Sequence, residues 1–321
     1  MKAIVYEKYG SPDVLRMEEI ERPIPGDKEV LVKVHAVSIN SWDWDTLTGK
    51  PFEYRFLFGL LHPKSTKMHG CEIAGVVEKI GEHIKRFQVG DEVFGDIAEN
   101  GWGAFAEYTC AHENYLVLKP SCMTFEQAAC LSHGGNLAVQ GLIDYGKIKS
   151  GQNVLINGGG GSTGTLAIQI AKLFDVEVTA VDNTAKLDTM LELGADHVID
   201  YTKEDFTLNE RKYDLIFDVK TNRSIFDYQR SLGSKGIYVT VGGKTSRILQ
   251  ALIIGKLSSK YQVHMVAYKA NKDLKYLIEL FDTGKLKPVI DRCIPLDYTA
   301  EAFRYFGEGY FKGKIVVTLG A

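Results

Sequence analysis

The chain has 321 residues, of which 45% are hydrophobic and 25% charged, and its formal net charge is −3. This composition is typical of a folded protein with one large domain or two smaller ones, and it excludes extensive disorder. A balanced, slightly acidic charge argues against binding to nucleic acid or a membrane surface, because both present negative phosphates. No apolar run approaches the ~20 residues that span a bilayer, and the N-terminal segment lacks signal-peptide features. We therefore expect a soluble, cytoplasmic protein.

The cysteines are widely spaced, without any C-x-x-C pair, and they are Cys71, Cys110, Cys122, Cys130 and Cys293. An odd number at irregular spacing is typical neither of a disulfide framework nor of a structural zinc cluster. We expect reduced thiols that are mostly buried.

The first 125 residues have the pattern of strands joined by turns. Segments rich in β-branched and aromatic residues alternate with Gly and Pro, while helical periodicity is scarce. The expected strands cover residues 2–7, 29–39, 73–81 and 104–111. This pattern predicts a compact all-β unit, which we expect to be a small barrel.

From residue 126 onward, short apolar strands alternate with helices. The strands are expected at residues 154–157, 177–181, 197–200, 213–219, 237–241 and 262–266. Strands alternating with helices predict βαβ units and a parallel sheet. The closing strand KIVVTL is expected to return to the β unit. The α/β domain, residues 126–289, is then an insertion between residues 1–125 and residues 290–321.

The stretch VLINGGGGSTGTLAIQIAKLF (154–174) joins a strand to a helix through a glycine-rich turn. Gly159, Gly161 and Gly164 fit the G-x-G-x-x-G pattern of a dinucleotide site. The first glycine permits the tight turn, the second lets the backbone approach a pyrophosphate, and the third lets the helix pack on the strand. Backbone N–H groups around Ser162 and Thr163 would then meet the phosphate charge at the helix N-terminus.

Asp182 lies at the end of the second strand of this domain, 21 residues beyond Gly161. A carboxylate there would accept hydrogen bonds from the adenosine ribose and favour NAD over NADP. Asn183 and Lys186 could instead contact a 2′-phosphate. The residues alone leave both cofactors open, and an ordinary turn is the alternative for Asp182.

The sequence resembles the medium-chain dehydrogenase/reductase superfamily, in its zinc-independent quinone oxidoreductase (zeta-crystallin-like) branch. Besides the glycine-rich stretch, the matching segments are MKAIVYEKYGSPDVL, SINSWDWDTLTG (38–49), GCEIAGVVEKIG (70–81), FQVGDEVFG (87–95), LGADHVIDY (193–201) and GKIVVTL (313–319). They cover essentially the whole chain.

This resemblance implies an α/β fold with a GroES-like β-barrel catalytic domain and a Rossmann domain built on a doubly wound parallel sheet. Family members use NADPH to reduce quinones, enones or alkenals, usually as homodimers. The resemblance also implies cofactor contacts at Tyr201 and Gly242, and a position for Lys314 near the cofactor phosphates. Where quinone reductases have a Ser and a basic residue, this chain has Asn183 and Ala185, so both NADPH and NADH are retained as expected cofactors.

Zinc-dependent relatives bind their catalytic ion at positions that correspond here to Asn40, Cys71 and His133. Asn is a poor zinc ligand, although Glu72 stands beside Cys71 as an alternative third one. The cysteine-rich loop of structural zinc is also missing between Asp91 and Thr109. We therefore expect no zinc.

Without a Lewis acid, the chemistry favours acceptors that are already activated by conjugation. Asn40 is the expected donor to the substrate oxygen, and Asp43 is expected to orient it or the loop. Both residues could equally cap a turn. Two other hypotheses stay open: a zinc-dependent alcohol dehydrogenase with atypical ligands, and a dinucleotide-binding sensor or structural protein without catalysis.

Overall fold

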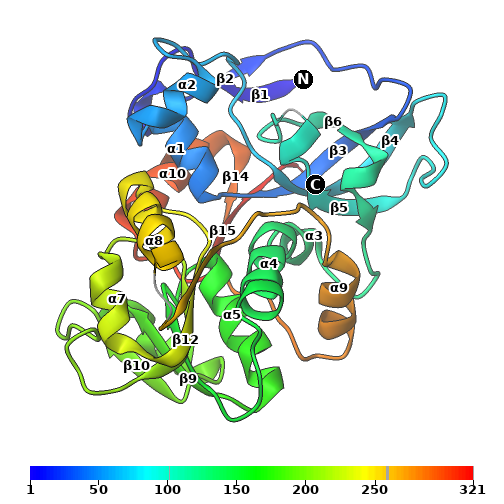
Figure 1. Ribbon diagram of the computed structural model, residues 1–321. Helices are drawn as coiled ribbons and strands as arrows, with labels where there is room; N and C mark the ends of the chain where they lie inside the picture. The colour runs from blue at the N-terminus through cyan, green and yellow to red at the C-terminus, as the bar shows by residue number, and fades with distance from the viewer. Residues whose placement is uncertain (101, 258–259, 321) are drawn as a thin grey trace. The chain divides into compact units, whose positions relative to one another are not determined.

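The computed structural model describes residues 1–100, 102–257 and 260–320, and the chain divides into two compact units (Figure 1). Unit 1 comprises Met1–His133, Ala270–Leu274 and Ile290–Ala321. Unit 2 comprises Gly134–Lys269 and Lys275–Val289. The first division falls after His133 rather than at residue 125, and the last segment of unit 1 begins at the expected residue 290.

Unit 1 is built on a mixed sheet with the strand order β14-β15-β3-β4-β5-β7, and β6 pairs with β3. A separate hairpin joins β1 and β2. The strands are β1 (Lys2–Val5), β2 (Arg16–Glu19), β3 (Glu29–Ser38), β4 (Glu72–Ile80), β5 (Glu92–Asp96), β6 (Tyr108–His112), β7 (Val117–Leu118), β14 (Ile290–Pro295) and β15 (Lys314–Thr318). The helices are α1 (Ser41–Thr48), α2 (Arg55–Phe58), α3 (Phe125–Ala128) and α10 (Thr299–Glu308).

The C-terminal strand β15 pairs antiparallel with β3, with Val316 opposite Ser38. The expected return of KIVVTL to the β unit is therefore confirmed. In the first half of the long strand β3, Val30, Val32 and Val34 point into one core, and after a register shift between Val34 and Ala36 the strand adds Val37 to the same core. This alternation fixes the register, because a shift by one residue would turn those side chains to the opposite face.

Unit 2 has a six-stranded sheet in the order β10-β9-β8-β11-β12-β13, with every adjacent pair parallel. The strands are β8 (Asn153–Asn157), β9 (Glu177–Asp182), β10 (His197–Asp200), β11 (Tyr213–Asp218), β12 (Leu232–Thr240) and β13 (Gln262–Met265). The helices are α4 (Ser132–Val139), which begins in unit 1, the π-helical turn η5 (Gln140–Tyr145), α5 (Ser162–Ala171), α6 (Leu187–Glu192), α7 (Ile225–Ser231), α8 (Thr245–Leu257) and α9 (Leu274–Asp282).

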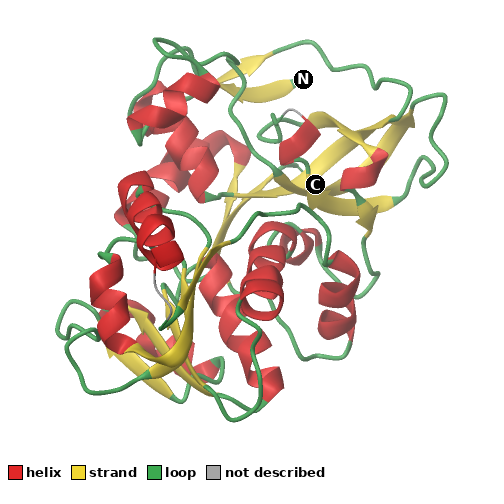
Figure 2. Ribbon diagram, viewed as in Figure 1, coloured by secondary structure: helices red, strands yellow, loops and turns green. Residues whose placement is uncertain are grey.

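Helices cover both faces of this parallel sheet, with α5 on one face and α7 and α8 on the other (Figures 1 and 2). The strand order is that of a doubly wound sheet. From β8 the chain adds β9 and β10 on one side and then β11, β12 and β13 on the other, so the strand order reverses next to β8. Ligands of such sheets bind outside the carboxyl ends of the strands at this reversal. The expected Rossmann domain is confirmed. Among the described residues, no helix combines the length and apolarity needed to cross a membrane.

Candidate functional site

The glycine-rich turn of unit 2 lies directly after β8, at the reversal point of the sheet. The N–H groups of Gly158 and Gly159 both donate to the carbonyl of Val181 at the end of β9, at 2.9 and 3.0 Å. A Cβ atom on Gly159 would lie 2.8 Å from the Met190 sulfur, and one on Gly164 would lie 2.1 Å from the Gly158 carbonyl oxygen. The first and third glycines of the motif are therefore required by packing within the turn.

Gly161 stands apart, because a Cβ there would have only an ordinary contact of 3.6 Å with Gly158. Its φ of −88° is also open to any residue. The next residue, Ser162, begins α5, and its buried Oγ has no hydrogen-bond partner among the described residues. Packing within the turn does not require a glycine at Gly161, and the Ser162 hydroxyl beside it has no described partner at the helix N-terminus. Both features fit a turn that binds the pyrophosphate of a dinucleotide.

The Asp182 side chain holds this turn through hydrogen bonds to its backbone. Its Oδ2 accepts the Gly160 N–H at 3.0 Å, its Oδ1 accepts the Asn183 N–H at 2.9 Å, and the Lys186 ammonium lies 3.5 Å from Oδ1. Both Asp182 and Lys186 are buried. Sequence reasoning treated these two residues as alternative cofactor contacts, whereas the structure pairs them with each other.

The remaining expected cofactor residues are distributed as follows. Thr163 is buried in the first turn of α5, and Gly242 follows β12 with φ 152° and open space around it. Tyr201 is half exposed, and its N–H donates to the Asp182 carbonyl at 3.1 Å. These residues all belong to unit 2.

Lys314 does not belong to this group of unit 2 residues. It lies in unit 1 with only 2% of its surface exposed, and its ammonium donates to Ser38 Oγ, Asn40 Oδ1 and Glu72 Oε2. All three of its ammonium hydrogens are used inside unit 1, and its expected place near the cofactor phosphates stays a prediction.

Asn40 is nearly buried beside this lysine, at the N-terminal end of α1. Its Oδ1 accepts from Lys314 at 2.5 Å, while its Nδ2 has longer contacts, at 3.3 Å to the Ser38 carbonyl and 3.3 Å to Glu72. Its backbone N–H donates to Asp43 Oδ2 at 2.7 Å. The two expected catalytic residues are thus adjacent, and Asp43 holds the start of the helix.

Asp43 is fully buried, and its Oδ1 has no hydrogen-bond partner among the described residues. Burial raises the pKa of this carboxyl to about 7, against an ordinary value of 3.8. The N–H of Asn40 and the charge of Lys314 oppose the shift without cancelling it. Asp43 therefore has a substantial neutral population near neutral pH.

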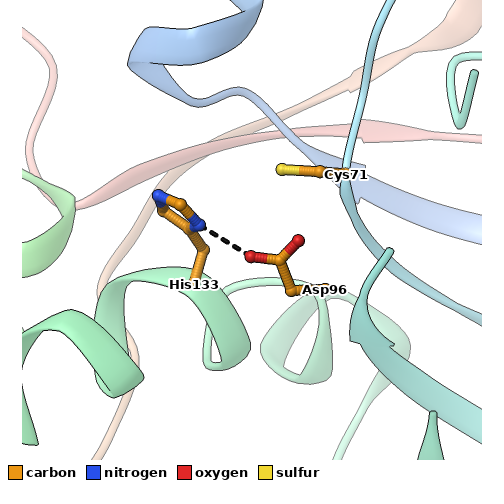
Figure 3. Close-up of side chains that lie close together, drawn as sticks. All are labelled: Cys71, Asp96 and His133. Atoms are coloured by element: carbon orange, nitrogen blue, oxygen red, sulfur yellow. Dashed lines mark hydrogen bonds and ion pairs between the residues drawn. The ribbon is translucent and has the colours of Figure 1, made fainter. Parts of the chain in front are cut away.

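A second group of titratable side chains meets in unit 1, where Cys71 precedes β4, Asp96 ends β5 and His133 lies in the first turn of α4 (Figure 3). One potential ligand atom from each lies within 4.8 Å of the others. His133 Nδ1 and Asp96 Oδ2 are hydrogen-bonded at 2.7 Å. The Asp96 backbone is held by the Asn271 side chain, which accepts its N–H at 2.8 Å and donates to its carbonyl at 2.7 Å.

Sequence reasoning missed Asp96 and considered Glu72 as the third residue here. The signal lies in strand pairing, because β4 and β5 are antiparallel neighbours with Glu72 opposite Asp96. Glu72 instead accepts hydrogen bonds from Lys314, Ser38 and the His133 N–H, at 2.5, 2.6 and 2.7 Å.

Two protein-family models match this chain, one within unit 1 and one mainly within unit 2. An alcohol dehydrogenase GroES-like domain model matches residues 26–121, and a zinc-binding dehydrogenase model matches residues 193–317. A chloroplastic quinone-oxidoreductase from Triphysaria versicolor is 34% identical, over 99% of this chain and 98% of the relative. The chain belongs to the quinone oxidoreductase branch of the medium-chain dehydrogenase/reductase superfamily.

Other members of this superfamily branch are similarly close. An NADPH-dependent alkenal/one oxidoreductase from Arabidopsis thaliana is 33% identical, over 99% of this chain and 79% of the relative. The structure of the quinone oxidoreductase from Coxiella burnetii superimposes with a TM-score of 0.91 at 28% identity, covering 100% of this chain and 99% of the other. The expected family and fold are confirmed.

Because one matching model describes zinc-binding dehydrogenases, we compared the Cys71, Asp96 and His133 group with a zinc site. A tetrahedral ion keeps nitrogen and oxygen ligands about 3.3 Å apart. Here the imidazole and carboxylate instead bond each other at 2.7 Å. Burial, followed by the carboxylates of Asp96 and Asp43, raises the pKa of the Cys71 thiol well above its usual range, which favours the thiol over the thiolate ligand. In this arrangement His133 and Asp96 bond each other and the Cys71 thiol is protonated, so the three residues do not present the spaced nitrogen, oxygen and thiolate ligands of a zinc site.

Proposed function

We propose that this family member is an NADPH-dependent reductase that transfers hydride to a quinone, enone or alkenal without zinc. The observation that carries the proposal is the turn at Gly161 and Ser162, which leaves backbone and hydroxyl available to a pyrophosphate. The substrate class is supported by the relatives that are named as quinone or alkenal/one oxidoreductases.

The dinucleotide, when bound, supplies the hydride from its nicotinamide ring. Unit 2 binds it through the N-terminus of α5, where N–H groups and Ser162 Oγ meet the phosphate charge. In unit 1, Asn40 donates its amide N–H to the substrate oxygen, where negative charge gathers as the hydride adds. Asp43 orients Asn40 by accepting its backbone N–H.

Preference for NADPH is supported by the state of Asp182. Its oxygens accept two backbone N–H groups and its charge faces Lys186, so less of that charge is available to repel a 2′-phosphate. The Arabidopsis thaliana relative is also named for NADPH. We expect kcat/KM to be higher with NADPH than with NADH.

The test is a steady-state assay that follows loss of the reduced nicotinamide absorbance. NADPH and NADH are each combined with benzoquinone, phenanthrenequinone, an enal and a simple aldehyde, with and without chelator. Oxidation of NADPH by the conjugated acceptors, unchanged by chelator, supports the proposal. Activity with the simple aldehyde alone, abolished by chelator, contradicts it and favours a zinc-dependent alcohol dehydrogenase. Cofactor binding without turnover contradicts it in favour of a binding protein.

A further inference from the structure

The position of Lys314 follows from strand pairing. In the antiparallel pair of β15 with β3, Val316 lies opposite Ser38 and the Ile39 N–H donates to the Ile315 carbonyl at 3.0 Å. Continuing this register past the end of β3 brings Lys314 opposite Asn40. Two residues that are 274 positions apart in the sequence are therefore direct cross-strand neighbours.

The Lys314 ammonium is a cation held in the interior. Burial alone would lower its pKa, but the surrounding groups, Glu72 first among them, together outweigh burial and raise the pKa of Lys314. Glu72 is itself fully buried and accepts hydrogen bonds from Ser38, Ser132 and the His133 N–H. A buried ion pair of this kind is a weak source of stability, because both charges lose their hydration. Its place beside Asn40 calls for another explanation.

The two ends of the Asn40 amide are held very differently. The oxygen accepts from Lys314 at 2.5 Å, whereas the Nδ2 contacts with protein oxygens are 3.3 Å or longer. A cation at the oxygen draws electron density from the amide nitrogen and makes its N–H groups stronger donors. The Asn40 Nδ2 hydrogens are therefore available to donate to another acceptor.

We infer that Lys314 is a positioning residue, which fixes and polarises the Asn40 amide so that its N–H stabilises the developing oxyanion of the substrate. This inference rests on the proposed function, in which Asn40 contacts the substrate oxygen. The Lys314 ammonium, acting through the Asn40 amide, then supplies part of the electrostatic stabilisation that a Lewis acid gives in other enzymes.

The test compares Lys314→Met, which removes the cation, with Lys314→Arg, which keeps a permanent cation at the same place. The acceptors are cinnamaldehydes that carry para substituents from electron-withdrawing nitro to electron-donating methoxy. For Lys314→Met we expect kcat to fall about tenfold or more, with acceptor KM changed less than about threefold. The loss should be largest for the methoxy compound, because that substrate stabilises its own negative charge least.

Lys314→Arg should keep the wild-type dependence on the substituent, whatever its effect on stability. Folding of both variants is checked by thermal unfolding and by the dissociation constant for NADPH, which should match wild type because all three Lys314 hydrogens are used within unit 1. Equal substituent dependence in wild type and Lys314→Met overturns the inference. A large rise in the NADPH dissociation constant of Lys314→Met also overturns it, in favour of a phosphate contact.

A double-mutant cycle with Asn40→Ala supplies the second readout. If Lys314 acts through Asn40, adding Lys314→Met to Asn40→Ala causes little further loss of kcat. Independent, multiplicative losses contradict the inference. An inactive wild-type protein would instead contradict the proposed function, so the two failures are distinguishable.

Discussion

At the scale of single residues, Asp43 is the clearest case of a polar group buried at a cost. One oxygen caps α1 through the Asn40 N–H, and the other has no hydrogen-bond partner among the described residues. Burial accordingly raises the pKa of this carboxyl from 3.8 to about 7. Sequence reasoning selected Asp43 for its place in the motif, but burial and the unpaired oxygen depend on the packing of segments that are distant in the sequence.

This pKa shift predicts a specific effect of pH on stability. The folded protein retains the Asp43 proton between its ordinary value of 3.8 and about 7, so its contribution to stability is lost as pH rises through that window. Asp43→Asn stays neutral throughout, and its amide oxygen can still accept the Asn40 N–H. Relative to wild type, the variant should gain about 1–4 kcal/mol between pH ~4 and pH ~7.

Urea unfolding of both proteins at the two ends of this window measures the difference directly. The comparison also removes the opposing effect of His69, whose pKa is lowered to about 4 by burial and which both proteins share. Stability curves that stay parallel across the window would show that Asp43 is ionised in the folded protein.

At the scale of elements, the glycine-rich turn between β8 and α5 contains glycines kept for two different reasons. Gly164 is needed because a Cβ would lie 2.1 Å from the Gly158 carbonyl oxygen, whereas Gly161 meets no such obstacle. The motif spacing predicted both from sequence, since strand, turn and helix are consecutive. The pairing of Asp182 with Lys186 was not predicted although the residues are four positions apart, because it also depends on the burial of both side chains.

Alanine substitutions separate these two reasons. Gly164→Ala should lower both the melting temperature and NADPH binding, because the turn itself is strained. Gly161→Ala should melt close to wild type yet bind NADPH about tenfold or more weakly, because its methyl group stands where the backbone approaches the pyrophosphate. Thermal unfolding and fluorescence titration with NADPH measure the two effects. Wild-type affinity in Gly161→Ala would mean that the pyrophosphate does not contact this turn.

The arrangement of Cys71, Asp96 and His133 predicts the metal content of the purified protein. Because His133 and Asp96 bond each other and the pKa of the Cys71 thiol is raised, purified protein should contain zinc well below one ion per chain. Elemental analysis by mass spectrometry after dialysis is the measurement, with Cys71→Ser as the matched control. One zinc per wild-type chain, lost in Cys71→Ser, would contradict the prediction.

At the scale of the whole molecule, the sequence was sufficient for the fold because each element carries its own pattern. The parallel strands are short apolar runs near their expected positions, and the closing strand β15 pairs with β3 as expected. The site of unit 1 was harder to predict, because it joins residues from the beginning and end of the chain. Asn40 and Lys314 were each singled out, but only the register of β15 against β3 places them together.

Metal-free transfer of hydride to a conjugated acceptor can be followed with a deuterium label. Chelator-treated protein is incubated with NADPH deuterated at the transferring position and an enal, and the product is analysed by NMR. Deuterium is expected on the β-carbon of a saturated aldehyde. Deuterium on the carbonyl carbon of an allylic alcohol, formed only when zinc is restored, would contradict it.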